Sequence, residues 1–173
     1  WELTLKNNKS ISVVIAAAGK GTRTGLKYPK CLYEIEGAPI LIRIINALYP
    51  WSEMPTIVAS PSGESLILNA LAKHNIENNC IVQPSPNGMG DAILKLKNIN
   101  YLSENILLAW GDLPFISKDS IDKLIKNYFL TKSDFSLITA FEHQPYTVVV
   151  RDSKNKIKKK IETRENKNFI SKT

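Results

Sequence analysis

The sequence is poor in cysteine and histidine, with two of each among its 173 residues. Cys31 and Cys80 are too few for a disulfide-stabilised scaffold, so we expect two reduced thiols in a cytoplasmic protein, with room for one disulfide at most. His74 and His143 have no cluster of cysteine or acidic residues around them at metal-ligand spacing, which argues against a zinc site. The sequence also contains no pattern that resembles a Ser-His-Asp or Cys-His catalytic set.

Long hydrophobic runs are missing as well. No apolar stretch reaches the roughly 18 residues that cross a membrane. The first apolar run, residues 11–18, leads into a glycine loop and not into a signal-peptide cleavage site. The sequence begins at Trp1 and not at methionine, so we expect it to be a piece of a longer chain. With 43% hydrophobic and 23% charged residues, the composition is that of an ordinary globular domain.

Excess positive charge is found at one end only. The formal net charge is +7, yet residues 1–150 carry 14 Lys and Arg against 13 Asp and Glu. Residues 151–173 carry nine against three, mainly in a lysine run from Lys154 to Lys160. A nucleic-acid-binding domain spreads its basic residues over a face. We therefore interpret the run as a solvated surface and expect no nucleic-acid partner.

Short apolar runs alternate with stretches of helical length. Strands are predicted at residues 11–18, 56–60, 80–83, 105–110, 135–141, 146–151 and 156–162, the last two pairing across residues 152–155. Helices are predicted at residues 39–49, 64–74, 91–96 and 117–130, the last with Ser117 as its N-cap. This alternation predicts an α/β fold with a Rossmann-like, doubly wound and mostly parallel sheet, in a single domain over residues 1–173.

Three loops follow predicted strands, at residues 19–30, 84–90 and 111–114, where such sheets bind ligands. The first loop begins with the residues Ala16, Ala17, Ala18, Gly19, Lys20, Gly21, Thr22 and Arg23, and it ends with Pro29 and Lys30. Small residues let the backbone approach a ligand, and successive N–H groups can form an anion-binding nest. Two cations suit a polyphosphate. Taken alone, however, the glycine pair favours an ordinary tight turn.

Two common phosphate-binding signatures are absent from this loop. Thr24 stands where the dinucleotide fingerprint has its third glycine, and there is no G-K-[ST] of a Walker A loop. The whole string instead resembles the signature of the nucleotidyltransferases that make nucleoside-diphosphate sugars, L-A-A-G-x-G-T-R-M followed by a short spacer and P-K. Ala16 replaces the usual Leu, and Thr24 the usual Met. The spacer has the length found in bacterial N-acetylglucosamine-1-phosphate uridylyltransferases.

Further segments resemble the same family in the same order. Residues 31–40 are similar to its L-x-x-x-x-G-x-P segment, and residues 82–92 to Q-x(4)-G-[TM]-[GA]-x-A. Residues 107–114 resemble a hydrophobic strand ending in G-D-x-P. Residues 146–162 resemble the segment Y-G-x-[IV]-V…E that surrounds the sugar. Together these motifs span residues 11–162.

The resemblance implies a Rossmann-like nucleotidyltransferase that transfers a nucleotidyl group from a nucleoside triphosphate to a sugar-1-phosphate, with Mg²⁺ as cofactor. It implies that Arg23 holds the β- and γ-phosphates, that Lys30 stabilises charge at the α-phosphate and that Asp112 binds Mg²⁺. The nucleotide-binding residues that it implies are Ala16, Ala17, Ala18, Gly19, Gly21, Thr22, Gln83, Gly88, Met89, Trp110 and Gly111. The sugar-binding residues are Tyr146, Thr147 and Glu162.

Some positions depart from the family pattern. Thr147 occupies the place of a sugar-contacting glycine, while Met89 and Trp110 replace a common Thr and Tyr beside the nucleotide. The family domains are longer, and no residue here corresponds to their sugar-binding asparagine or second metal ligand. An Asp in a Gly-Asp-x-Pro sequence is also good turn chemistry, which is the alternative for Asp112. We interpret Cys31 as a packing residue.

Two other functions are therefore kept open. One is a cytidylyltransferase that acts on another phosphorylated alcohol, and the other is a non-catalytic domain that senses a nucleotide or sugar nucleotide. The base is a pyrimidine in our interpretation, but the Gln83 amide both donates and accepts and so can pair with uracil, thymine or cytosine. The sugar and the oligomeric state are not fixed by the sequence.

Overall fold

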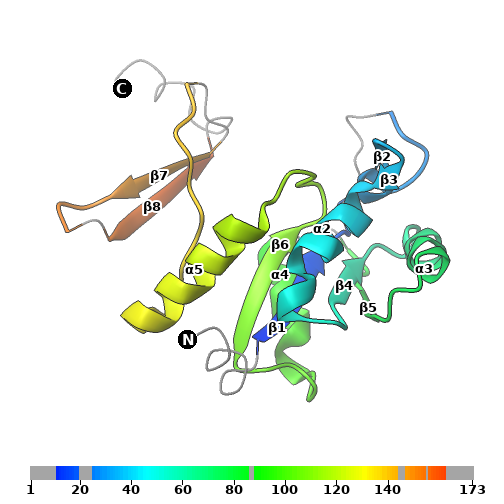
Figure 1. The fold of residues 1–173 in the computed structure, drawn as a ribbon, viewed down its shortest axis with the longest axis horizontal. Helices are drawn as coiled ribbons and strands as arrows, with labels where there is room; N and C mark the ends of the chain where they lie inside the picture. Colours follow the sequence, from blue (N-terminus) through cyan, green and yellow to red (C-terminus); the bar gives the residue numbers. More distant parts are fainter. Residues whose placement is uncertain (1–10, 20–24, 86–87, 144–146, 155, 163–173) are drawn as a thin grey trace. The chain divides into compact units, whose positions relative to one another are not determined.

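The computed structural model describes residues 11–19, 25–85, 88–143, 147–154 and 156–162 (Figure 1). By its internal contacts the chain divides into two compact units, Trp1–Ile121 and Asp122–Thr173. In the described part of the chain, no helix is both long enough and apolar enough to cross a membrane.

A parallel sheet forms the centre of the first unit. Its strands are β1 (Ile11–Ala16), β4 (Thr56–Ala59), β5 (Asn79–Val82) and β6 (Asn105–Trp110). They lie in the order β5-β4-β1-β6, and all neighbours are parallel. The predicted α/β fold with a parallel sheet is therefore confirmed.

The predicted helices are present within two residues of their expected bounds. They are α2 (Ile40–Leu48), α3 (Glu64–Lys73), α4 (Met89–Lys95) and α5 (Lys118–Thr131), with short 3₁₀ turns η1 (Lys30–Leu32), η2 (Tyr49–Trp51) and η3 (Leu96–Asn98). Pro39 precedes α2 and fixes its entry. The Ser117 hydroxyl accepts a hydrogen bond from the Ser120 N–H at 3.2 Å, so the predicted N-cap of α5 is confirmed.

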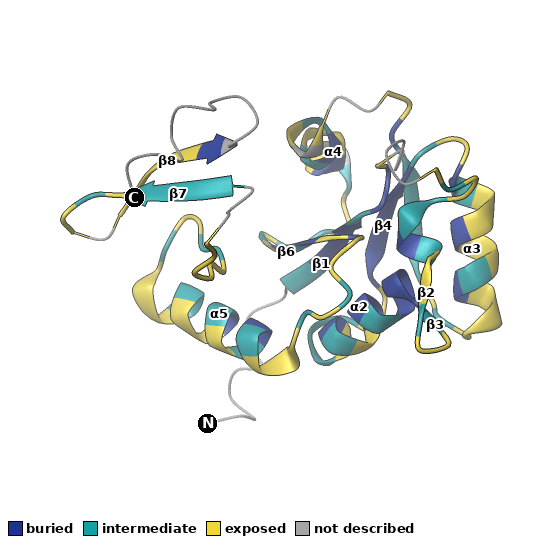
Figure 2. Ribbon diagram, turned by 90° about the horizontal axis from the view of Figure 1, so that it is seen from above, coloured by how far each residue is buried: buried dark blue, intermediate teal, exposed yellow. Residues whose placement is uncertain are grey.

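Helices cover both faces of the sheet, because its central strands are apolar on both sides. Figure 2 shows α4 on one face and α2 on the other. On the α4 side, Ala92 and Leu96 pack with Val14 and Val58 in one buried cluster. All four residues of β4 are buried. This packing holds the central strands in place, and with them the loops that follow their carboxyl ends.

The strand order reverses beside β1. From β1 the chain proceeds to β4 and β5 on one side, and it then returns to β6 on the other. The register aligns Ala16 with Val58 of β4 and with Trp110 of β6, so the strands end at a common edge. In open α/β sheets, the crevice at such a reversal is the usual ligand site.

A small antiparallel hairpin, not predicted from the sequence, follows η1. It consists of β2 (Glu34–Ile35) and β3 (Ala38–Pro39). Its two turn residues, Glu36 and Gly37, have φ values of 52° and 78°. Positive φ at both central residues is typical of the two-residue turns that match strand twist.

The second unit contains an antiparallel hairpin of β7 (Thr147–Arg151) and β8 (Ile157–Glu162), as expected. The strand predicted at residues 135–141 is wrong, because the backbone there is irregular. Phe135 and Phe141 are strongly exposed. An alternation of apolar residues makes a strand only where a neighbouring strand supplies hydrogen bonds, and residues 135–141 pair with none of the described strands.

Candidate active site

The loop that leaves β1 is tied to its two neighbouring strands through the backbone. The Ala17 N–H donates to the Val58 carbonyl at 2.8 Å, and the Gly111 N–H donates to the Ala16 carbonyl at 2.9 Å. Ala17 and Ala18 are buried, whereas Gly19 is exposed. Backbone hydrogen bonds thus hold the start of this loop at the sheet, and the loop reaches the protein surface at Gly19. Gly21, Thr22 and Arg23 lie outside the described residues.

Gly111 lets β6 approach this loop closely. A Cβ at Gly111 would stand 3.0 Å from the Ala16 carbonyl oxygen and 3.2 Å from the Ala17 Cα and Cβ. Those distances are too short for a side chain without movement of the backbone. The glycine of the G-D-x-P motif therefore has a steric reason, which the sequence alone did not reveal.

Lys30 and Asp112 meet at this edge of the sheet, although 82 positions separate them. The Lys30 Nζ donates to Asp112 Oδ2 at 3.0 Å. Lys30 begins η1, and Asp112 follows β6 by two residues. The two side chains are 42% and 46% exposed. A pair so open to water contributes at most about 1 kcal/mol to stability, so it can open at little cost when a ligand binds.

Two neighbouring contacts hold the segments that carry Lys30 and Asp112. Gly63 lies beneath the first segment, since a Cβ there would stand 2.8 Å from the Pro29 Cγ and 2.9 Å from the Ser60 Oγ. Because Gly63 has no side chain, Pro29 can pack against the loop after β4. This contact positions Lys30, the next residue.

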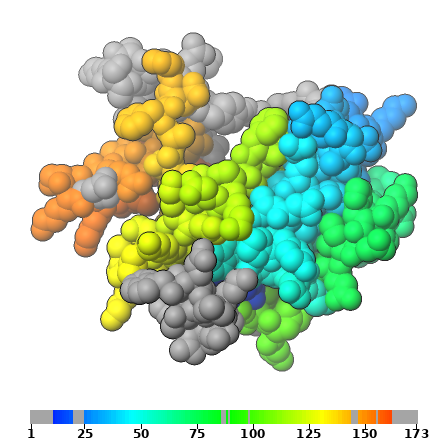
Figure 3. Space-filling view, viewed as in Figure 1, coloured from blue at the N-terminus to red at the C-terminus, as the bar shows by residue number. Residues whose placement is uncertain are grey.

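Arg43 supports the second segment. Its Nη1 donates to the Ile35 carbonyl at 3.3 Å and to Glu36 Oε2 at 3.4 Å. Its guanidinium lies 5.9 Å from the centroid of the Phe115 ring, a cation–π arrangement. The space-filling view shows the segment that follows β6 against the first turns of α2 (Figure 3). Arg43 was not predicted, although it is the only charged residue of a mostly apolar helix, a signal that could have found it.

Gln83 follows β5 at the same edge and is 4% exposed. Its Nε2 donates to the Gly88 carbonyl at 3.1 Å and to Asp91 Oδ2 at 2.7 Å. Gly88 has φ +90°, a conformation that favours glycine. Asp91 lies in the first turn of α4 and was predicted only as a helix residue. The Met89 side chain is outside the described part.

Trp110 ends β6 directly beside Ala16 in the sheet register, and half of it is exposed. It offers an accessible aromatic surface next to the loop after β1. The predicted nucleotide residues that the structure describes thus lie at the carboxyl ends of β1, β5 and β6 and in the loops that follow these strands. They are Ala16 to Gly19, Gln83, Gly88, Trp110 and Gly111.

The predicted sugar residues belong to the second unit. Thr147 and Glu162 face each other across the β7–β8 ladder. Tyr146 lies outside the described residues, and the structure describes Glu162 by its backbone alone. These assignments stay predictions.

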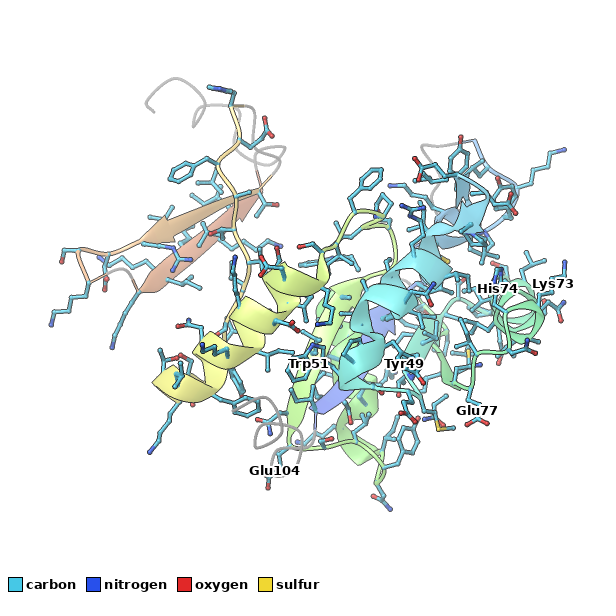
Figure 4. All side chains as sticks on the ribbon, in the orientation of Figure 1. Tyr49, Trp51, Lys73, His74, Glu77 and Glu104 are labelled. Atoms are coloured by element: carbon cyan, nitrogen blue, oxygen red, sulfur yellow. The ribbon has the colours of Figure 1, made fainter. Side chains whose placement is uncertain are left out.

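Cys31 is buried, which raises the pKa of its thiol to about 12, and the negative charge of Asp112 acts in the same direction. Burial also raises the pKa of Cys80. Both thiols are free and remain protonated at neutral pH. Figure 4 labels His74 beside Lys73 at the end of α3. Among the described residues, no three His, Cys, Asp or Glu side chains gather as a metal-binding group.

Comparison with known proteins adds independent information. The profile of the MobA-like NTP transferase domain matches residues 13–173. The bifunctional protein GlmU of Buchnera aphidicola subsp. Schizaphis graminum is 36% identical over 137 residues, which cover 79% of this chain. The match spans 29% of that relative's length.

Two solved structures share the fold. One is a putative glucose-1-phosphate thymidylyltransferase from Bacillus anthracis, with TM-score 0.60 and 16% identity, covering 70% of this chain and 51% of that one. The other is 4-diphosphocytidyl-2C-methyl-D-erythritol synthase from Anaerococcus prevotii, with TM-score 0.59 and 22% identity, covering 86% and 63%.

Proposed function

The chain belongs to the MobA-like NTP transferase domain family, and on that premise we propose that it transfers a nucleotidyl group from a nucleoside triphosphate to a sugar-1-phosphate. Pyrophosphate is the second product. The observation that carries the proposal is the 3.0 Å pair of Lys30 and Asp112 at the strand-order reversal. These residues come from two separate motifs: the resemblance implies that Lys30 acts at the α-phosphate and that Asp112 binds Mg²⁺.

The reaction is a displacement at the α-phosphorus. An oxygen of the sugar phosphate forms a bond to that phosphorus while the bond to the bridging oxygen breaks, and the electron pair leaves with pyrophosphate. Such a step needs positioning and charge neutralisation more than covalent participation by the protein. Lys30 supplies a fixed positive charge at the α-phosphate. Arg23 and the N–H groups of residues 19–22 hold the β- and γ-phosphates.

Asp112 fits a Mg²⁺ site of the kind that is completed by substrate phosphates. Mg²⁺ is commonly held by one or two carboxylates together with phosphate oxygens and water. The Asp112 side chain is 46% exposed and lies beside the proposed phosphate position. When bound there, Mg²⁺ would neutralise phosphate charge and polarise the α-phosphate.

The remaining residues recognise the two substrates. Gln83 faces the pyrimidine edge, and Trp110 provides an apolar surface for the nucleoside. Tyr146, Thr147 and Glu162, which the resemblance assigns to the sugar, recognise it in this proposal. A carboxylate that accepts hydrogen bonds from sugar hydroxyls orients the sugar phosphate for attack.

The test is pyrophosphate release with each of the five common nucleoside triphosphates and a panel of sugar-1-phosphates and other phosphorylated alcohols. We expect turnover with a pyrimidine triphosphate. Lys30→Ala should lower kcat about 10²-fold, and by more than it weakens nucleotide binding, because its charge acts on the transition state. Lys97→Ala, in η3 between the end of α4 and the start of β6, removes an exposed lysine that has no proposed role and should leave turnover unchanged.

Two outcomes would contradict the proposal in different ways. Nucleotide binding without turnover on any acceptor would favour a sensing domain. Turnover with a phosphorylated alcohol that is not a sugar-1-phosphate would keep the nucleotidyl transfer and replace the acceptor. In the second case Lys30→Ala distinguishes a role in binding, where affinity and turnover fall equally, from a role in the reaction.

A further inference from the structure

The two side chains that the proposed function assigns to different ligands neutralise each other. Lys30 Nζ lies 3.0 Å from Asp112 Oδ2. Among the residues that the structure describes, neither side chain has a second hydrogen-bonding partner. The positive charge assigned to a phosphate and the negative charge assigned to a metal ion therefore satisfy each other in this contact.

This contact works against a metal ion that binds alone. A cation that approaches Asp112 must either displace the Lys30 ammonium or remain beside it, and like charges so close together repel each other. Both side chains are almost half exposed, so water screens the repulsion and keeps its effect on affinity modest. Lys30 thus weakens the binding of a divalent metal ion to Asp112.

The same contact works against a triphosphate that binds without a metal ion. Lys30 must leave Asp112 to reach a phosphate, and the unpaired Asp112 carboxylate then faces the negative charge of that phosphate. A metal ion at Asp112 removes this second repulsion, and a phosphate at Lys30 offsets the repulsion between Lys30 and the metal ion. Each ligand therefore strengthens the binding of the other, and such a coupling is reciprocal.

We propose that the Lys30–Asp112 ion pair makes this site select a nucleotide that carries a divalent metal ion over the metal ion or the free nucleotide alone. The inference rests on the proposed function, which assigns Lys30 to a phosphate and Asp112 to the metal ion. It adds that each residue opposes the ligand of the other when that ligand comes alone. A lysine and an aspartate that bound their ligands independently would show no such opposition.

The first measurement uses Mn²⁺, a paramagnetic substitute for Mg²⁺, in the absence of nucleotide. Electron paramagnetic resonance reports the free Mn²⁺ in titrations of the wild type, of Lys30→Met and of the control Lys97→Met, which removes an exposed lysine of η3. Lys30→Met should bind Mn²⁺ about fivefold more tightly than the wild type, and Lys97→Met should match the wild type. The double variant Lys30→Met/Asp112→Asn should lose this gain, because it lacks the carboxylate that binds the ion.

The second measurement is the dissociation constants of UTP and CTP, determined by calorimetry in EDTA and again with excess Mg²⁺. In EDTA, Asp112→Asn should bind the triphosphate about fivefold more tightly than the wild type, because Lys30 is released and a repelling charge is gone. With Mg²⁺ it should bind the triphosphate less tightly than the wild type. Asp119→Asn, at the start of α5, is the matched control and should follow the wild type in both conditions.

The signs of these changes decide the matter. Unchanged or weaker Mn²⁺ binding by Lys30→Met would overturn the inference, and so would a gain that persists in the double variant. Unchanged or weaker triphosphate binding by Asp112→Asn in EDTA would overturn it as well, while leaving the proposed function intact. If the wild type binds neither triphosphate under either condition, the proposed function itself fails, and the inference fails with it.

Discussion

The two units of the chain differ in how firmly they hold the residues proposed to act. In the first unit those residues follow strands of a sheet whose central strand β4 is entirely buried. In the second unit they lie on a two-stranded hairpin, and among the described residues there only Ile125 and Ile161 are buried. A hairpin of two strands is marginal on its own, whereas a covered parallel sheet is rigid. We therefore expect the first unit, the nucleotide half, to hold its residues in place before a substrate binds. The residues of the second unit, the acceptor half, should adjust more when the sugar phosphate binds.

The largest effect is expected at the nucleotide half. Asp112→Ala should lower Mg²⁺-dependent pyrophosphate release by about 10³-fold, because it removes the carboxylate proposed to hold the metal. The unfolding free energy should change by less than about 0.5 kcal/mol, since the ion pair with Lys30 is exposed. Steady-state kinetics and urea unfolding measure the two quantities.

The control for that variant is Asp119→Ala, which removes an aspartate from the start of α5. It should retain turnover. Full activity of Asp112→Ala would remove the metal assignment and leave Asp112 as a turn residue.

A smaller effect is expected from the backbone contact that makes the nucleotide half rigid. Gly111→Ala places a Cβ 3.0 Å from the Ala16 carbonyl oxygen, so the two strand ends must separate. We expect a loss of about 2 kcal/mol in unfolding free energy, typical of overpacking. Thermal or urea unfolding provides the measurement.

Gly19→Ala is the matched variant, because nothing lies within 4 Å of a Cβ at that position. It should change stability by less than about 0.5 kcal/mol. If both variants lose the same stability, the close approach of β6 to the loop after β1 does not matter for rigidity.

The smallest effect is expected at the acceptor half. Glu162→Gln replaces a charged acceptor by a neutral one and should raise the KM for the sugar phosphate about tenfold. The dissociation constant of the nucleotide should stay the same, since the change lies in the other unit. An equal loss of affinity for both substrates would mean that the two halves are not independent.

The sequence predicted the elements whose signals are local. Strand β6 was predicted at its observed bounds, because the apolar run from Ile106 to Trp110 ends directly in Gly111 and Asp112. Ser117 was recognised as a helix cap for the same kind of reason. The loops at the sheet edge were identified from the alternation of strands and helices, which implies parallel strands whose carboxyl ends lie together.

The elements and contacts that were missed have no sequence pattern that reveals them, or lack the partner that their pattern requires. The two-residue strands β2 and β3 are too short for any periodic pattern. Residues 135–141 carry the alternation of a strand but pair with no described strand, so the prediction there was wrong. The contact between Gln83 and Asp91 requires the chain to turn at Gly88, and no residue pattern announces it.

The most direct test of the central claim is a thermal-shift measurement with UTP, CTP, dTTP, ATP and GTP, each with and without Mg²⁺. The claim is that the loops at the carboxyl edge of the first unit bind a nucleoside triphosphate. A ligand that binds only the native state adds about 2.7 kcal/mol of stability at a hundred times its dissociation constant. We predict that a pyrimidine triphosphate clearly raises the melting temperature and that Mg²⁺ increases this rise. In Asp112→Ala the rise should no longer depend on Mg²⁺. No rise with any triphosphate, in the presence of Mg²⁺, would contradict the account.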